Sequence, residues 1–207
     1  MDDFAKDFFE KHNIDLKYVI DAEGNPVNDS LIEIMRQQNK YFAYNTTKCE
    51  KGHSLRARSK HCIVCDTFKI QKYKELYSPG FVYIAGSKKK KIIKIGSSKD
   101  NWTIEKRQNY LNEKKGYAET NDWKILYSYF CDKRGFHEKE IHKLLKPYHA
   151  DGLVYQKEDL TNSTEVYYCS YKKAFDVCEQ YFNDKEIKKN MIEKTFEEYK
   201  FPTLKKA

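Results

Sequence analysis

The stretch GFVYIAGSKKKKIIKIGSSKDNWTIEKR, residues 80–107, decides the fold of this chain. Its apolar runs at 81–85 and 92–96 have the length of short strands, and the basic run between them is typical of a turn. Asn101 is a residue type that commonly caps a helix, and a helical pattern follows it to about Glu113. The stretch therefore predicts a β-hairpin followed by a helix.

The pattern downstream extends this unit into a complete layer. A strand is predicted at 123–130, a helix at 135–146 that ends at Pro147, and a strand at 166–169. A helix is predicted from Tyr171 to about Lys200, either continuous or broken near Asn183-Asp184. From residue 80 the order is β-β-α-β-α-β-α. This order predicts an α+β fold in which a small mixed β-sheet is flanked by helices.

Upstream, the chain divides into shorter pieces. A helix at 2–12, a strand at 16–20, a helix at 30–41 that begins with a Ser30 and Glu33 capping box, and a linker helix at 69–77 are predicted. Residues 45–68 have little apolar content and carry metal-type ligands. We therefore predict four parts. They are an N-terminal α/β segment at 1–46, which starts with a helix, a zinc knuckle at 47–68, the main domain at 78–182 and a C-terminal helical extension at 183–207.

The zinc prediction depends on two close pairs of ligands in KCEKGHSLRARSKHCIVCD, residues 48–66. Cys49 and His53 are four residues apart, and Cys62 and Cys65 form a C-x-x-C pair. Two such pairs, separated by a short loop, suit a tetrahedral structural Zn²⁺ site. His61 is an alternative ligand, but it adjoins Cys62 and would strain the pair. A redox C-x-x-C is a weaker interpretation, because no thioredoxin-like βαβ pattern surrounds it.

Charge is concentrated in the middle third of the chain. Residues 47–117 hold eighteen Lys or Arg and six Asp or Glu, a net charge of +12, whereas 1–46 carry −4 and 118–207 carry none. A localised basic block predicts a polyanionic partner such as DNA, although a solubilising surface is the simpler alternative. The predicted nucleic-acid contacts are Arg56, Arg58 and Lys60 in the knuckle, and Lys88, Lys89 and Lys90 in the hairpin turn.

Composition excludes other classes of protein. The chain has no run of about 18 apolar residues and an acidic, non-apolar start, so we expect no membrane segment, no secretion and a cytoplasmic location. Six cysteines in such a chain are thiols or metal ligands more often than disulfides. Cys131, Cys169 and Cys178 are expected to be ordinary buried thiols.

The main domain resembles the GIY-YIG nucleases, and in particular their phage-type subfamily. Val82-Tyr83 resembles the I-Y pair, Lys94-Ile95-Gly96 resembles Y-I-G, and Arg107 matches the helical arginine. Glu138 and His142, in E-x-x-x-H, resemble the helix that carries a metal-binding glutamate. Thr164–Tyr168 resembles the closing strand of the subfamily. The knuckle likewise resembles Cys-His-Cys-Cys knuckles of phage and mobile-element endonucleases.

Two positions depart from the family pattern. Phe81 stands where the family usually has glycine, and Leu111 stands where many members carry His or Tyr four residues after the arginine. Tyr110 is adjacent to Leu111, and Glu165 lies near the place of an asparagine on the last strand. Whether Tyr110 or Glu165 joins the site is left open by the sequence.

The resemblance implies a metal-dependent DNA endonuclease, and the residues suit that chemistry. A hairpin lets Lys94 face Tyr83, and a nearby cation favours the phenolate form of a tyrosine. The guanidinium fork of Arg107 suits phosphate oxygens. Glu138 suits Mg²⁺ or Mn²⁺, but helical phase does not separate it from Glu140.

Three functions compete at this point. The first is cleavage of double-stranded DNA in a restriction, phage or mobile-element setting. The second is DNA binding without catalysis by a protein that keeps the GIY-YIG fold. The third is a structure-selective or single-strand nuclease, in which aromatic stacking dominates. The sequence does not define an oligomeric state.

Overall fold

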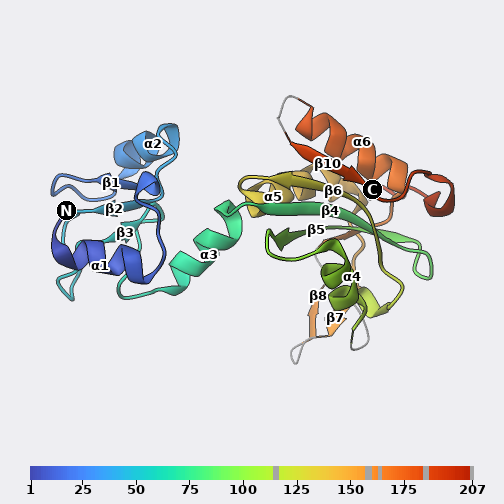
Figure 1. The fold of residues 1–207 in the computed structure, drawn as a ribbon, viewed down its shortest axis with the longest axis horizontal. Helices are drawn as coiled ribbons and strands as arrows, with labels where there is room; N and C mark the ends of the chain where they lie inside the picture. The colour runs from blue at the N-terminus through green and yellow to red at the C-terminus, as the bar shows by residue number, and fades with distance from the viewer. Residues whose placement is uncertain (114–116, 157–159, 163–164, 184–186, 206–207) are drawn as a thin grey trace. The chain divides into compact units, whose positions relative to one another are not determined.

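The computed structural model describes residues 1–113, 117–156, 160–162, 165–183 and 187–205. It has two compact units, Met1–Lys74 and Glu75–Ala207 (Figure 1). The boundary between them falls within the predicted linker helix, α3 (Phe68–Tyr77). No helix in the described part of the chain is both long and apolar enough to cross a membrane.

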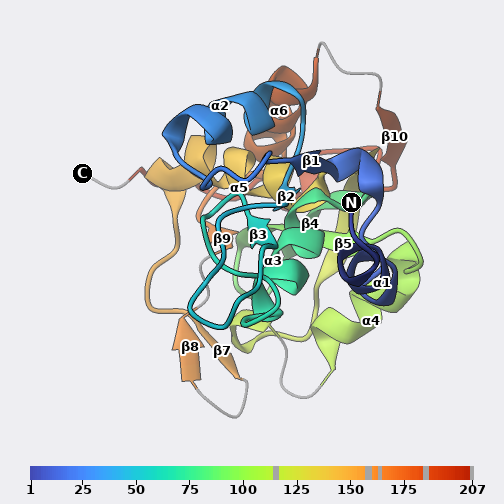
Figure 2. The same ribbon diagram turned by 90° about the vertical axis from the view of Figure 1, so that its left-hand side faces the viewer.

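The first unit is built on a three-stranded sheet between two helices. Strand β1 (Val19–Asp21) runs parallel to β2 (Phe42–Tyr44), and β2 pairs antiparallel with β3 (Arg56–Ala57). The sheet lies between α1 (Asp3–Lys11) and α2 (Asp29–Gln37), as two perpendicular views show (Figures 1 and 2). Because β3 belongs to the knuckle segment, the knuckle shares a sheet with the N-terminal segment.

Two local predictions for this unit are wrong. The capping box at Ser30 is replaced by Asn28, whose side chain accepts a hydrogen bond from Leu31 N at 2.9 Å, so α2 begins at Asp29. The strand predicted at 16–20 begins as a 3₁₀ turn, η1 (Leu16–Tyr18), because the Asp15 side chain accepts from Lys17 N at 3.0 Å. In both cases a local side-chain cap decides the start of the element.

The second unit contains a five-stranded sheet, and all its strand pairs are antiparallel. The long strands β4 (Gly80–Ser87) and β5 (Ile92–Lys99) form the predicted hairpin, and β6 (Lys124–Cys131) pairs with β4. The order is β10-β6-β4-β5-β9. The edge strands are β9 (Val166–Tyr167) and β10 (Lys188–Met191).

Helices cover both faces of this sheet. Helices α5 (Arg134–Leu145) and α6 (Tyr171–Phe182) lie on one face, and α4 (Ile104–Asn112) lies on the other (Figure 1). A hairpin of β7 (Val154–Gln156) and β8 (Leu160–Asn162) precedes β9. Short 3₁₀ turns η2 (Tyr117–Glu119) and η3 (Lys146–Tyr148) join the elements. The predicted α+β fold class is confirmed. The main sheet was predicted to be mixed, but its described strand pairs are all antiparallel, and the parallel pair β1–β2 lies in the first unit.

The N-terminal cap of α4 and the C-terminal extension differ from prediction. Thr103, not Asn101, caps α4 by accepting from Lys106 N at 3.1 Å. The helix predicted from Tyr171 ends at Phe182, next to the alternative break at Asn183-Asp184, and does not continue to Lys200. The chain returns as β10 and the 3₁₀ turn η4 (Glu197–Tyr199). The predicted helical extension is therefore wrong. The residues of β10 are all exposed, and their pairing with β6 overrides their local helical preference.

Candidate functional site

Tyr83 and Gly96 face each other across the β4–β5 hairpin. They are direct partners in the strand register, and Tyr83 is fully buried. A Cβ at position 96 would lie 2.4 Å from the Tyr83 hydroxyl oxygen and 2.6 Å from its Cζ. Gly96 is therefore required for the tyrosine ring to cross the neighbouring strand. The Y-I-G pattern has a steric reason in this chain.

Arg107 is held over Tyr83 by a hydrogen bond and by aromatic rings. Its Nε donates to the Tyr83 hydroxyl at 3.0 Å. Its guanidinium carbon lies 5.3–5.7 Å from the ring centres of Tyr83, Trp102 and Tyr110, within the range of cation–π attraction. Among the described residues, its two terminal nitrogens have no hydrogen-bond partner. They remain available to an anion.

Lys94 is completely buried and belongs to an ion pair. It lies on the same sheet face as Tyr83, two positions from Gly96, as the hairpin predicts. Its ammonium forms a close salt bridge with Glu165 and lies 3.9 Å from the ring centre of Tyr117. Tyr117 also donates to Glu165 at 3.1 Å. Lys94 is thus paired with Glu165, and the hydrogen bond to the Tyr83 hydroxyl comes from Arg107.

Glu138 approaches the hairpin from the opposite face, on α5. It accepts a hydrogen bond of 2.7 Å from Ser97, which neighbours Gly96 and points toward α5. Burial, with repulsion from Glu165, raises the pKa of the Glu138 carboxyl. Burial also opposes ionisation of Glu165, but Lys94 outweighs it and lowers the pKa of that carboxyl. Of the two carboxyl groups, Glu165 therefore loses its proton more readily and Glu138 retains its proton to higher pH.

His142 and Glu140 take different directions from the same helix. His142 is four residues after Glu138, and its Nε2 lies 3.3 Å from the Ile95 carbonyl oxygen. Burial lowers the His142 pKa to about 4, so the imidazole is neutral near pH 7. Glu140 instead pairs with Lys143 at 2.6 Å. The structure therefore separates Glu138 from Glu140, which helical phase did not.

These side chains meet where β9 stops pairing with β5. The β5–β9 register includes only Ile93 and Lys94, followed by one hydrogen bond from Ile95 N to Glu165 O at 3.1 Å. Beyond Ile95, no described strand pairs with β5 on this side. Groups from both sheet faces can therefore converge on one edge of β5. The charges there influence one another, since Lys94 and Arg107 both lower the Glu138 pKa.

Several residues at this edge had weak or no sequence signal. Ser97, Trp102 and Tyr117 contact Glu138, Arg107 and Glu165 respectively, but each is an isolated residue in the sequence. Leu111 is in the hydrophobic core, whereas Tyr110 is exposed beside Arg107. Thr164, expected at the start of the closing strand, lies outside the described residues.

The raised pKa of Glu138 predicts a stability cost at neutral pH. A folded-state pKa above the ordinary value of 4.5 means that the native protein holds this proton more tightly than the unfolded chain does. Stability is therefore lost as pH rises from the ordinary pKa through the folded one. We expect Glu138→Gln to raise the melting temperature by a few degrees at pH 7 and to have little effect at pH 4. Thermal unfolding without Mg²⁺ checks this, and an equal change at both pH values would contradict it.

The four predicted zinc ligands come together in the first unit. The ligand atoms of Cys49, His53, Cys62 and Cys65 all lie within 4.8 Å of one another. The Sγ atoms of Cys49 and Cys65 are 3.9 Å apart, and His53 Nδ1 lies 3.3–3.8 Å from the three sulfurs. A Zn–S length of about 2.3 Å gives tetrahedron edges of roughly 3.8 Å. The donor set and its spacing are compatible with zinc.

Local backbone and packing shape this cluster. Gly52 has a φ of +81° and donates to Cys49 O at 2.8 Å, which closes the tight turn between Cys49 and His53. The ring of Phe4 on α1 stacks on His53 at an interplanar angle of 7°. His61 is directed away, with Nδ1 2.8 Å from Ser59 O. The alternative ligand is therefore outside the cluster, and all six cysteines are free thiols.

The basic residues of the knuckle are engaged within their own unit. Arg56 donates to Lys60 O at 3.1 Å, and Arg58 donates to Lys40 O at 3.2 Å. Lys60 forms a salt bridge of 2.9 Å with Asp29. These side chains fix the knuckle loop to the sheet and to α2, a role that the sequence did not indicate.

Arg58→Ala is expected to destabilise the first unit by about 1–3 kcal/mol. The substitution removes a charged donor from a carbonyl oxygen and a guanidinium that lies 4.8 Å from the Tyr41 ring centre. Lys51→Ala, an exposed cation of the same knuckle, is the matched control. Urea unfolding of both variants checks the difference. Equal midpoints would show that Arg58 has no structural role.

The hairpin lysines also have acidic or polar partners. Lys88 pairs with Glu198 at 2.5 Å, Lys90 pairs with Glu119 at 3.3 Å, and Lys89 donates to Asn121 at 2.8 Å. They are at the turn, five or more residues from Tyr83, which is about 17 Å along a strand. The turn is therefore separate from the β5 edge and partly neutralised.

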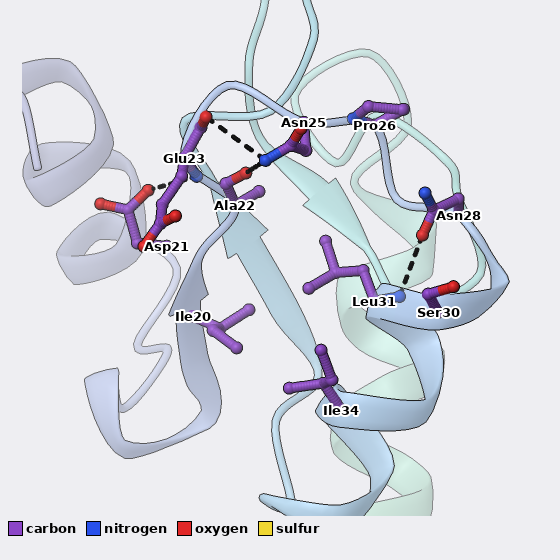
Figure 3. A pocket seen from close by; sticks show the side chains of 10 residues that line it. All are labelled: Ile20, Asp21, Ala22, Glu23, Asn25, Pro26, Asn28, Ser30, Leu31 and Ile34. Carbon is purple, nitrogen blue, oxygen red and sulfur yellow. Dashed lines mark hydrogen bonds between the residues drawn. The ribbon is translucent and has the colours of Figure 1, made fainter.

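A pocket of about 350 Å³ lies in the first unit, between the turn after β1 and the start of α2 (Figure 3). Ile20, Leu31 and Ile34 supply its apolar wall, and Asn28, which caps α2, supplies a polar rim. It includes none of the predicted site residues.

Comparison with known proteins gives a family match over the part of the chain that contains the β5 edge. No curated protein and no solved structure matches the chain. Residues 80–182, just under half of the chain, match the family model described as the T5orf172 domain. The GIY-YIG family itself gives no match. The residues matched by this model form the hairpin, α4, α5 and α6.

Proposed function

We propose that this protein is a metal-dependent endonuclease of the GIY-YIG type that hydrolyses phosphodiester bonds of DNA. We place it in a restriction, phage or mobile-element setting with double-stranded DNA as substrate, and in the cytoplasm. The observation that carries the proposal is the meeting of Tyr83, Arg107 and Glu138 at one edge of β5. The T5orf172 match over residues 80–182 supports it.

Each group has a distinct task in this proposal. In its deprotonated form Tyr83 accepts a proton from the attacking water, and the N–H donated by Arg107 holds the tyrosine oxygen in place. The water oxygen bonds to phosphorus as the bond to the leaving sugar oxygen breaks. The terminal nitrogens of Arg107 bind the phosphate oxygens whose charge grows during this step.

Glu138 is proposed as the protein ligand for Mg²⁺ or Mn²⁺. Among the described residues, only the knuckle brings together three or more metal-type ligands. A metal ion at Glu138 would therefore be held by this carboxylate together with water and substrate oxygens. A metal ion held by Glu138 would stabilise negative charge at the phosphate and at the leaving oxygen. The neutral His142 and the Lys94–Glu165 pair line the same edge, and we assign them to positioning and proton movement.

Tyr83→Phe is expected to slow plasmid cleavage by about 10²–10⁴-fold, because it removes the proposed base and keeps the ring. Arg107→Lys is also expected to be poor, since a point charge does not replace the guanidinium fork. Supercoiled plasmid is incubated with Mg²⁺, with Mn²⁺ and with neither. Tyr129→Phe, another buried tyrosine of the same sheet that packs on Phe182, is the matched control.

The alternative is a DNA-binding protein without nuclease activity. The burial of Leu111 favours it, because the position where many GIY-YIG proteins carry His or Tyr supplies no polar group. In that case the wild type shifts DNA in gels but leaves the plasmid intact at every metal concentration. If it cuts, and Tyr83→Phe, Arg107→Ala and Glu138→Ala cut equally well, the GIY-YIG mechanism is refuted.

A further inference from the structure

Two aromatic side chains form a small surface beside Arg107. Trp102 precedes α4 and is partly exposed, and Tyr110 on α4 is 45% exposed. Their ring centres are 5.6 Å apart with an interplanar angle of 73°. Both rings lie within 5.7 Å of the Arg107 guanidinium carbon. Lys106 adds a second cation, 5.2 Å from the Trp102 ring centre.

A cage for Arg107 explains only part of this arrangement. It accounts for the ring faces that meet the guanidinium, and the buried Tyr83 supplies a third such face. Holding Arg107 does not account for the part of Tyr110 that is exposed to solvent beside this arginine. An exposed aromatic surface next to a cation with free donors is the combination that nucleotides recognise, since the phosphate meets the cation and the base meets a ring.

We propose that Trp102 and Tyr110 form a stacking platform for one unstacked nucleobase next to the phosphate bound by Arg107. The inference rests on the proposed nuclease activity and replaces continuous double-stranded DNA with DNA that has an unpaired nucleotide as the preferred substrate. A base within a continuous duplex has both faces covered by its neighbours, so it reaches a platform only after extrusion, which costs energy. The site therefore prefers DNA with an unpaired nucleotide, such as a single strand, a bulge or a gap, over continuous duplex.

Intrinsic fluorescence tests the platform without any cleavage. The chain has two tryptophans, and Trp123 is 1% exposed in the core, so Trp102 is the one that a bound base reaches. The protein is titrated, without divalent metal ions and at one salt concentration, with a single strand, a bulged duplex and a continuous duplex of the same sequence. We expect the first two to quench emission and to bind more tightly than the continuous duplex. The quench is absent in Trp102→Phe, which retains Trp123.

Variants of Tyr110 separate stacking from fold. Tyr110→Ala is expected to weaken single-strand and bulge binding by about 5- to 100-fold and to weaken continuous-duplex binding by much less. Tyr110→Phe keeps the ring and should bind as wild type, and melting temperatures of both variants report on folding. If Tyr110→Ala binds every DNA as wild type does, or if continuous duplex binds as tightly as the single strand, the platform is wrong even when the protein cuts plasmid. A selective quench in a protein that never cuts supports the platform and contradicts the nuclease.

Discussion

Replacing Glu138 with alanine is expected to abolish Mg²⁺-dependent cleavage, by on the order of 10³-fold or more, and to leave DNA affinity nearly intact. Glu138 is the carboxylate that Ser97 holds at the edge of β5, whereas affinity comes from phosphate contacts elsewhere. Single-turnover cleavage and gel shifts in Ca²⁺ measure the two quantities separately. Protonation of Glu138 removes the form that binds metal, and burial raises the pKa of this carboxyl. Wild-type activity should therefore continue to rise with pH at values above the ordinary titration range of a glutamate side chain.

The matched control is Glu140→Ala, two residues along the same helix. Glu140 pairs with Lys143 at 2.6 Å, so its loss should leave cleavage unchanged. The opposite result, with Glu140→Ala inactive and Glu138→Ala active, would overturn the metal assignment while leaving the family resemblance intact. Inactivity of Glu138→Ala together with lost DNA binding would point to misfolding, which the melting temperature detects.

Removing zinc is expected to unfold the first unit. Structural zinc sites contribute about 10–16 kcal/mol in small zinc-binding peptides, which matches or exceeds the whole stability of a typical domain. We expect one zinc per chain by elemental analysis of protein purified without chelators. His53→Ala should lose the metal and the folded signal of this unit, because Nδ1 of His53 lies within 3.8 Å of all three sulfurs.

His61→Ala is the control for that experiment. His61 is exposed, adjoins Cys62 and has Nδ1 directed to Ser59 O, so the variant should keep one zinc and wild-type stability. A zinc content of zero in the wild type would refute the site. Loss of zinc from His61→Ala but not from His53→Ala would show that the ligand set is wrong.

The sequence was most informative where one strand pairing or one ligand pair determines the structure. Two short apolar runs on either side of the lysine turn predicted the β4–β5 hairpin, and paired spacing predicted which cysteines and histidine gather in the knuckle. The role of Glu165 was left open, because it is 71 residues from Lys94 in the sequence and the two come together only through the β5–β9 pairing. Likewise, β10 has no alternation to reveal it, since its residues are all exposed and tertiary pairing alone makes it a strand.

The return of the chain through β10 to Tyr199 has a consequence for synthesis on the ribosome. Every residue proposed for catalysis precedes Val166, but Tyr199 fills the core, and its ring lies 2.6 Å from where a Cβ on Gly86 would stand. Folding of nascent chains proceeds from the N-terminus, so the first unit can acquire zinc long before the sheet of the second closes. A truncated chain that ends near Phe182, where the T5orf172 match ends, would lack β10, the strand that pairs with β6, and would leave the core surface beneath Tyr199 uncovered. Until residues 187–199 have been synthesised, the second unit therefore lacks its β10 edge strand and the Tyr199 ring of its core.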